Sequence, residues 1–183
     1  MVVPVSYFYD NEYYANKEHA KQVEGLDIRR YVASGIVTFD LVTRQVKWSQ
    51  HLDLTTDYIT HRAYVYSSPT VIDLDGDGLL EVVVATSVGF VYVLGHDGEP
   101  EEGWPIQMGE IQAQVVVADV NDDGELEVVA ADVRGNFAVF NRHGKEIWER
   151  HLGSLISAPA TVADIDGDGH TDLVVGSASG KVW

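Results

Sequence analysis

The stretch DLDGDGLLE, Asp73 to Glu81, places carboxylates at alternate positions and then turns on two glycines. Nearly the same pattern returns as DVNDDGELE from Asp119 and as DIDGDGHTD from Asp164. Carboxylates held this close repel one another, so each of these three acidic loops (first, middle and last) requires a positive partner. The recurrence also indicates that the chain is built from repeated units.

The repeat extends well beyond the acidic loops. The loops open 46 and 45 residues apart, and a glycine follows each opening Asp after sixteen residues, at Gly89, Gly135 and Gly180. Apolar runs rich in Val, Ile and Thr lie before the loop, after the loop and after the glycine, and a Trp-bearing segment follows the first two glycines. Each unit therefore predicts four short strands, and a four-stranded repeat of about 45 residues is typical of a β-propeller blade.

These units predict an all-β fold, a β-propeller with four-stranded blades, incomplete at about three and a half blades. We expect a partial blade at 35–52, blades at 53–108 and 109–152, and a partial blade at 153–183. The first is supported by the Gly35 to Trp48 spacing, which equals that of Gly135 to Trp148. Residues 1–34 fit the repeat poorly, and a short helix is expected around 16–23. Such a set of blades is either a piece of a longer propeller or an open arc that another copy or a partner completes.

Composition narrows the possible partners. The 183 residues carry 29 acidic and 12 basic side chains, a formal net charge of -17, which disfavours binding to nucleic acid or to an anionic membrane. The 45% of hydrophobic residues suffice for a core, and the lack of cysteine excludes disulfides. No run is long and apolar enough to span a membrane, so we expect membrane association only through an anchor absent from this chain. The first residues show no signal-peptide pattern.

Each acidic loop has the donor pattern of a cation site. The side chains at positions 1, 3, 5 and 9 and the carbonyl at position 7 supply oxygen, and the glycine at position 6 allows the sharp turn. The predicted ligands are Asp73, Asp75, Asp77, Leu79 and Glu81; Asp119, Asn121, Asp123, Glu125 and Glu127; and Asp164, Asp166, Asp168, His170 and Asp172. An all-oxygen shell of several carboxylates favours Ca²⁺ over Mg²⁺, so about three calcium sites are expected.

Two other interpretations of the loops are weaker. An EF-hand needs a bidentate Glu at position 12, where this chain has Val84, Ala130 and Val175 within apolar runs. A solvated acidic turn without metal would suit one isolated loop better than three in register. The middle loop has Asn121 in place of an acid, so it is expected to bind calcium most weakly.

The loop pattern followed by LVVGSASGKVW resembles the FG-GAP, or integrin-α-like, repeat family. The segments HRAYVYSSPTVIDLDGDG, EIQAQVVVADVNDDGELE and GKEIWERHLGS are most similar to its plant members that act in pollen-wall assembly. The resemblance implies calcium in the loop between the first two strands of a blade, an extracellular or cell-surface location, and a role in adhesion or in matrix or cell-wall assembly. The Phe-Gly pair that names the family is absent at the start of each blade.

We expect a non-enzymatic interaction module with a protein or a cell-wall or matrix glycan as its partner. The alternative is a propeller enzyme, quinoprotein-like or polysaccharide-acting, with calcium as a structural ion. The seven histidines are scattered and no acid/base cluster stands out, so no catalytic residue is assigned. The long interval Asp53 to Pro69 is a candidate partner-binding loop opposite the acidic loops, with Tyr58, His61 and Arg62 as its test residues. An equal alternative is that it covers an exposed sheet edge.

Overall fold

The computed structural model describes residues 1–8, 14–21, 24–56, 58–59 and 62–183. Antiparallel strands in four sheets dominate this part of the chain, which confirms the all-β prediction. The first sheet holds β1 (Val2–Phe8), β2 (Tyr31–Phe39) and β3 (Val46–Thr56). The second holds β4 (Thr70–Ile72), β5 (Glu81–Ala85), β6 (Phe90–Leu94) and β7 (Ile106–Gln107).

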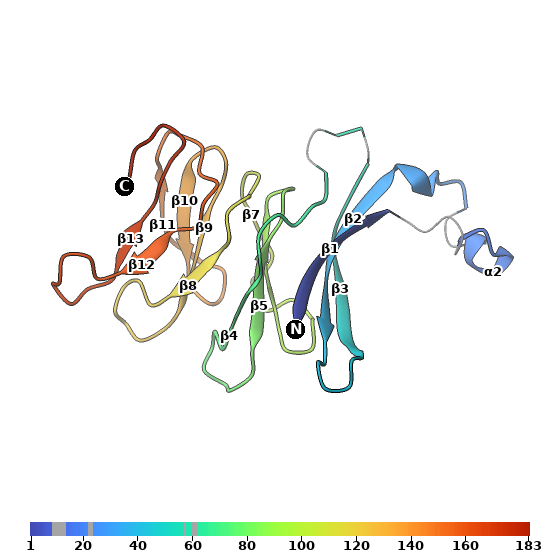
Figure 1. Cartoon of the computed structure of the whole chain (residues 1–183), viewed down its shortest axis with the longest axis horizontal. Coiled ribbons are helices and arrows are strands. Elements are labelled where there is room, and N and C mark those ends of the chain that lie inside the picture. Colours follow the sequence, from blue (N-terminus) through green and yellow to red (C-terminus); the bar gives the residue numbers. More distant parts are fainter. Residues whose placement is uncertain (9–13, 22–23, 57, 60–61) are drawn as a thin grey trace.

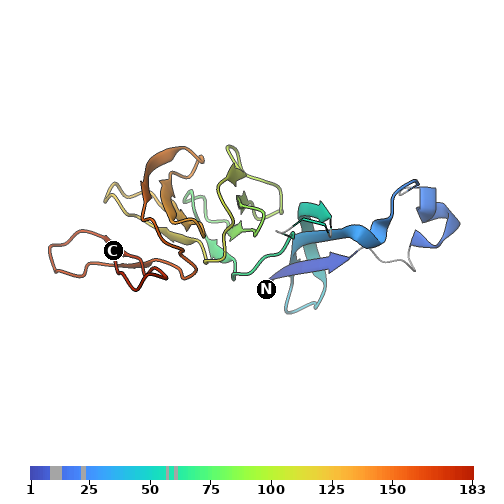
Figure 2. The same ribbon diagram turned by 90° about the horizontal axis from the view of Figure 1, so that it is seen from above.

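The remaining sheets continue the repeat. The third holds β8 (Val116–Ala118), β9 (Glu127–Ala131), β10 (Asn136–Phe140) and β11 (Glu146–His151). The fourth pairs β12 (Thr161–Ala163) with β13 (Asp172–Val174). The sheets lie side by side in chain order, and α2 (Lys17–Ala20) lies at the end remote from the fourth sheet (Figure 1 and Figure 2). Two four-stranded blades flanked by a three-stranded and a two-stranded sheet form a partial propeller.

The N-terminal segment contributes to the first sheet. Strand β1 pairs with β2 from Val2 opposite Thr38 to Phe8 opposite Val32, so this sheet extends beyond the expected boundary at residue 35. No acidic loop or leading glycine marks β1, and the repeat spacing therefore could not reveal it. Helix α2 lies within the expected range 16–23, of which residues 22 and 23 are outside the described part, and η2 (Ile28–Arg30) leads into β2.

The core is built from strands that are covered on both faces. In β5 every residue is buried: Val82 and Val84 pack toward Ile36 of the first sheet, while the alternate residues of β5 pack against the third sheet. Strand β9 is buried throughout in the same way, between the second and fourth sheets. Side chains alternate across a strand, so a continuous apolar run suits a strand that lies between two neighbouring blades, as predicted.

Tryptophans connect successive sheets. The indole Nε1 of Trp48 donates to the carbonyl of His96 in the second sheet, and that of Trp104 donates to the carbonyl of Arg142 in the third, both at 2.9 Å. Each accepting carbonyl lies in the turn between the third and fourth strands of the next blade. Trp104 is buried and Trp48 partly buried, and an indole removed from water needs such an acceptor, so the pairings hold neighbouring blades together.

The repeated glycine has a steric cause. Gly89 has a φ of 105°, and a Cβ there would lie 2.7 Å from the carbonyl oxygen of Met108. Gly135 has a φ of 92°, and its Cβ would lie 2.6 Å from the carbonyl oxygen of Ser154. At both positions the left-handed backbone and the close approach of the next segment require glycine.

Candidate metal centre

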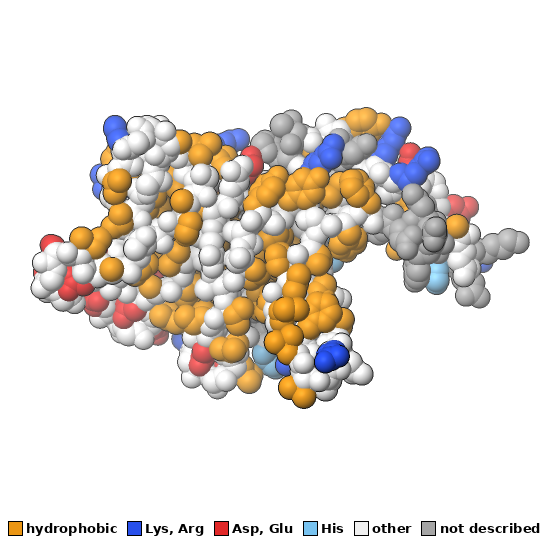
Figure 3. Space-filling model, in the orientation of Figure 1, with side chains coloured by type: hydrophobic (Ala, Val, Ile, Leu, Met, Phe, Trp, Pro, Cys, Tyr) orange, Lys and Arg blue, Asp and Glu red, His pale blue; other side chains and the backbone are white. Residues whose placement is uncertain are grey.

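The three acidic loops occupy equivalent places in three sheets. They join β4 to β5, β8 to β9 and β12 to β13, and they emerge along the same side of the sheets (Figure 1). In the space-filling view, Asp and Glu side chains gather along the same lower and left-hand edge (Figure 3). The repeat therefore concentrates negative charge on one side of the molecule, which is called the acidic-loop side below.

The opening Asp organises the turn of each loop. One oxygen of its carboxylate accepts the backbone N–H of the glycine at position 6: Gly78 to Asp73 at 3.0 Å, and Gly124 to Asp119 and Gly169 to Asp164 at 2.9 Å each. The three glycines have φ between 87° and 89°, in the left-handed region that favours glycine. The loop thus wraps around its first carboxylate, as the sequence pattern predicts.

The acid at position 9 is held from the other end. It accepts the backbone N–H of position 2: Leu74 to Glu81 at 2.7 Å, Val120 to Glu127 at 2.9 Å and Ile165 to Asp172 at 2.9 Å. In Glu81 and Asp172 this bond uses one carboxylate oxygen and leaves the second as a possible ligand, whereas the second oxygen of Glu127 accepts a bond from Asn121 at 3.4 Å. These side chains are positioned by the strands β5, β9 and β13, which begin at them.

In the first and last loops the acids converge. Ligand oxygens of Asp73, Asp75 and Glu81 all lie within 4.8 Å of one another, and those of Asp164, Asp166 and Asp172 do the same. Two oxygens bound to one Ca²⁺ at about 2.3–2.6 Å can be at most about 5 Å apart. The oxygens of both groups are therefore close enough to share one cation, and their hard donors suit calcium.

The middle loop differs because of Asn121. Its amide Nδ2 donates to Asp123 at 3.0 Å and, at 3.4 Å, to Glu127. At position 3 the middle loop thus directs an N–H group at its carboxylates, whereas the other two loops have a carboxylate there, Asp75 and Asp166. Within the described residues, no group of three acids converges in this loop. This difference gives a physical reason for a weaker middle site, which remains a prediction.

Positions 5 and 7 have a different local role. The carboxylates of Asp77, Asp123 and Asp168 each accept the backbone N–H two residues later, at 2.7, 2.8 and 2.9 Å respectively. These acids do not belong to the convergent groups of the first and last loops. Ligation by them and by the carbonyls of Leu79, Glu125 and His170 remains a prediction.

Burial and charge both act on the acids at position 9. Glu81 is 5% exposed and Glu127 is 1% exposed. Burial raises the pKa of both carboxyls, and the neighbouring carboxylates, Asp75 and Asp77 beside Glu81 and Asp123 and Asp119 beside Glu127, raise it further. A bound cation would favour the ionised form and would relieve this repulsion.

Two contacts near the loops were not anticipated. Glu101 contributes to the raised pKa of Glu81 and, with Arg142 and His143 of the next blade, lines a cavity of about 130 Å³ beside the first loop. His170 Nδ1 lies 2.6 Å from Asp122 Oδ2 and connects the last loop to the middle one. Glu101 is outside the repeated pattern, and the second contact joins residues 48 positions apart, so the loop spacing signals neither.

The described part of the connection after β3, residues 58–59 and 62–69, begins on the side opposite the acidic loops (Figure 1). Tyr58 is 70% exposed, and the guanidinium of Arg30 lies 4.9 Å from its ring centroid. The carbonyl of Arg62 accepts a hydrogen bond from Ser87, and His61 lies outside the described residues. The connection is thus attached to the second sheet through Ser87, and its role in partner binding remains a prediction.

The family follows from a direct match. The model of the FG-GAP-like repeat matches residues 73–130 and again 119–175, which together exceed half of the 183 residues. The chain belongs to the FG-GAP-like repeat family. Both matches begin at the opening Asp of an acidic loop, so the family pattern includes the acidic-loop sequence. No curated protein matches the sequence significantly.

Solved structures support the fold of this FG-GAP-like chain. BamB from Moraxella catarrhalis is similar with a TM-score of 0.58 at 18% identity, over 85% of this chain and 42% of BamB. The V. cholerae biofilm matrix protein Bap1 is similar with a TM-score of 0.56 at 18% identity, over 100% of this chain and 30% of Bap1. The chain thus spans less than half of either protein, and the similarity concerns the fold alone. Within the described residues, no helix has the length and apolarity to cross a membrane.

Proposed function

We propose that this FG-GAP-like chain is a calcium-binding interaction module, in which metal ions stabilise the loops between the first two strands of successive blades. The convergence of three carboxylates in the first loop and three in the last carries this proposal. Each ion would connect the strand that ends before the loop to the strand that begins after it. The ion would also neutralise acids that otherwise repel one another.

Calorimetric titration of the chelator-treated protein with CaCl₂, and separately with MgCl₂, tests the metal part. We expect two tighter calcium sites, the first and last loops, a weaker third, and much weaker binding of Mg²⁺, which prefers a rigid octahedral shell that retains water. Substitution of Asp73 and Asp164 together by Asn should remove the two tighter sites. Unchanged calcium binding in that variant would refute the assignment of the ions to these loops.

The partner and location form a second, separable part of the proposal. We propose an extracellular or cell-surface location and a protein or matrix or cell-wall glycan as the partner. The family membership and the fold that the chain shares with a biofilm matrix protein support this view. Detection of the native protein by protease protection and surface labelling tests the location, and an exclusively cytosolic signal would contradict it.

The relation to plant proteins of pollen-wall assembly is the most specific element of the proposal. It is based on the amino-acid sequence of the segments around the first and middle loops. Expression of the full-length protein in a plant line that lacks its wall-assembly member should restore the wall. We also propose that the module is non-enzymatic, and turnover of a polysaccharide or a co-purifying quinone would contradict this.

A further inference from the structure

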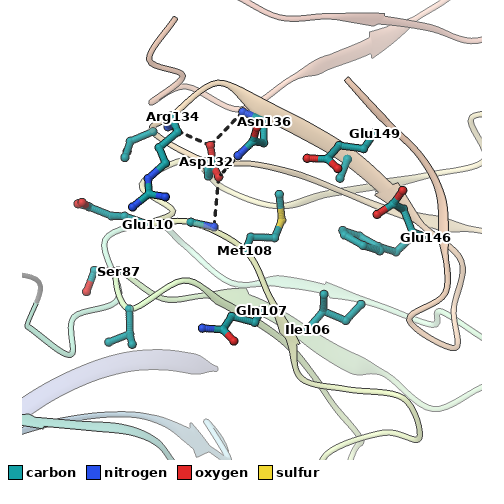
Figure 4. A pocket seen from close by; sticks show the side chains of 15 residues that line it. Ser87, Ile106, Gln107, Met108, Glu110, Asp132, Arg134, Asn136, Glu146 and Glu149 are labelled. Carbon is teal, nitrogen blue, oxygen red and sulfur yellow. Dashed lines mark hydrogen bonds between the residues drawn. The ribbon is translucent and has the colours of Figure 1, made fainter. Parts of the chain in front are cut away.

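A half-open cavity of about 560 Å³ lies between the second and third sheets (Figure 4). One wall is formed by β7 and the residues that follow it, Ile106 to Glu110, and the other by β10 and β11 of the third sheet. The turns at Ser87 and Arg134 close it on the side opposite the acidic loops, because each turn lies at the far end of a strand that begins at such a loop. Ligand-binding cavities typically measure about 300–1,000 Å³, so this one can hold several side chains.

A difference between matched positions creates the cavity. In β6, Phe90 and Tyr92 follow Gly89 by one and three residues and pack toward the first sheet. Tyr92 is 8% exposed, and its hydroxyl donates to Asp53 Oδ1 at 2.8 Å. In β10 the residues at the same distances from Gly135 are Asn136 and Ala138. Smaller side chains at these two positions leave open, between the second and third sheets, a space that aromatic rings fill between the first and second.

The cavity combines an apolar wall with carboxylates. Ile106, Met108 and Phe140 supply the apolar surface. Strand register places Glu149 opposite Ala138 and Glu146 opposite Phe140, and neighbours across an antiparallel pair point to the same face. Figure 4 shows both glutamates on the β11 side of the cavity. Both are exposed and, within the described part of the chain, neither forms an ion pair.

The remaining polar groups do not balance this charge. Asp132 is fully buried and accepts hydrogen bonds from Gly109, Arg134 and Asn136, so its carboxylate is used by the fold. Arg134 is the one cationic side chain among the described residues that line the cavity, against four carboxylates.

We propose that this cavity is a docking site for a positively charged segment of a partner protein. A Lys or Arg side chain of the partner would lie between Glu146 and Glu149, and a neighbouring aliphatic side chain would cover Met108 and Ile106. Charge complementarity with this strongly acidic chain favours a basic occupant over an acidic or neutral one. The inference rests on the interaction function proposed above and specifies that the partner binds through a positively charged segment.

Peptide binding tests the site in the presence of saturating CaCl₂. The probes are nine-residue Gly/Ser peptides that carry two basic and two aliphatic residues at varied spacing, with matched sets in which Gln or Glu replaces the basic residues. Amide NMR shifts at Gln107, Met108 and Ala138 report binding in the cavity. We expect basic peptides to shift these signals, and the Gln and Glu sets to leave them unchanged.

Variants separate the cavity from the overall charge. The double variant Glu146→Gln/Glu149→Gln should weaken binding of the best basic peptide about five- to tenfold. The control Glu24→Gln/Glu99→Gln makes the same charge change at exposed residues outside the cavity lining and should change affinity less than twofold. Ala138→Tyr copies the ring at the matched position of the preceding blade and should abolish binding by filling the space. If that variant does not fold, the two glutamate pairs still decide the question.

Three outcomes would overturn the proposal: no basic peptide shifts the cavity signals, neutral peptides bind equally well, or both glutamate pairs weaken binding alike. A calcium titration of the same sample keeps the two proposals apart. Calcium binding without peptide binding refutes the docking site alone, whereas peptide binding without calcium binding refutes the metal assignment alone.

Discussion

The first and middle acidic loops share one backbone design but differ in the chemistry at its centre. In both, the opening Asp accepts the glycine N–H and the closing Glu accepts the N–H of position 2. In the first loop three acids converge, whereas in the middle loop the amide of Asn121 donates to two acids. The comparison teaches that the two loops share the hydrogen bonds that shape the turn, while the residue at position 3 decides how much negative charge the loop presents to a cation.

Removal of calcium should have the largest effect. An ion at 100 times its Kd stabilises the folded form by about 2.7 kcal/mol per site, and in a chain of this size about 1 kcal/mol corresponds to roughly 2–4 °C in Tm. With two strong sites, we expect EDTA to lower the Tm by on the order of 10 °C or more. The measurement is thermal unfolding with CaCl₂ or EDTA at constant ionic strength. An unchanged Tm would show that both loops are held by their hydrogen bonds alone.

Matched substitutions at position 1 should distinguish the two loops. In EDTA, Asp73→Ala and Asp119→Ala each remove a carboxylate that accepts backbone N–H groups, and each should cost about 1–3 kcal/mol of unfolding free energy. In calcium, Asp73→Ala should lose roughly 2–3 kcal/mol more, because it also loses a tightly bound ion. Urea unfolding of both variants under both conditions measures this. Equal losses in calcium would contradict the difference between the loops.

Restoring an acid at the middle loop should strengthen its site. Asn121→Asp replaces the donating amide by a carboxylate, and we expect about tenfold tighter calcium binding there. In EDTA the same change adds a like charge and should lower the Tm slightly. The reverse change in the first loop, Asp75→Asn, is the matched control and should weaken calcium binding by a similar factor. Calorimetry on both variants gives the affinities. If the middle site still binds calcium weakly in Asn121→Asp, Asn121 is not the cause of its weak binding.

A smaller effect is expected from pH. Burial, followed by neighbouring carboxylates, raises the pKa of Glu81 and Glu127 above the ordinary value of 4.5. The folded metal-free protein therefore binds protons more tightly than the unfolded chain, and its stability increases as the pH falls through these raised pKa values toward 4.5. The Glu81→Gln/Glu127→Gln variant should lose this part of the pH dependence of Tm in EDTA. With calcium the trend should reverse, because protons compete with the ion.

The sequence by itself determined the blade repeat, the acidic loops and the composition of the core strands. These features are local: Asp at position 1 and Gly at position 6 shape the turn of each loop, and the apolar run Val82 to Ala85 of β5 needs cover on both faces. The chemical difference of the middle loop is local in the same way, since Asn121 alone changes the charge there, and its weaker calcium binding remains a prediction. The contribution of β1 to the first sheet could not be predicted, because no part of Val2–Phe8 belongs to the repeat.

The tertiary structure alone decided the features that depend on how blades meet. The Trp48 and Trp104 connections, the approach of Glu101 to Glu81 and the contact between His170 and Asp122 join residues from different strands or sheets. The cavity beside Ala138 arises in the same way, since its volume is set by what the neighbouring sheet leaves unfilled. Packing between blades depends on many side chains that are distant in the sequence. The spacing of motifs along the chain therefore does not predict it.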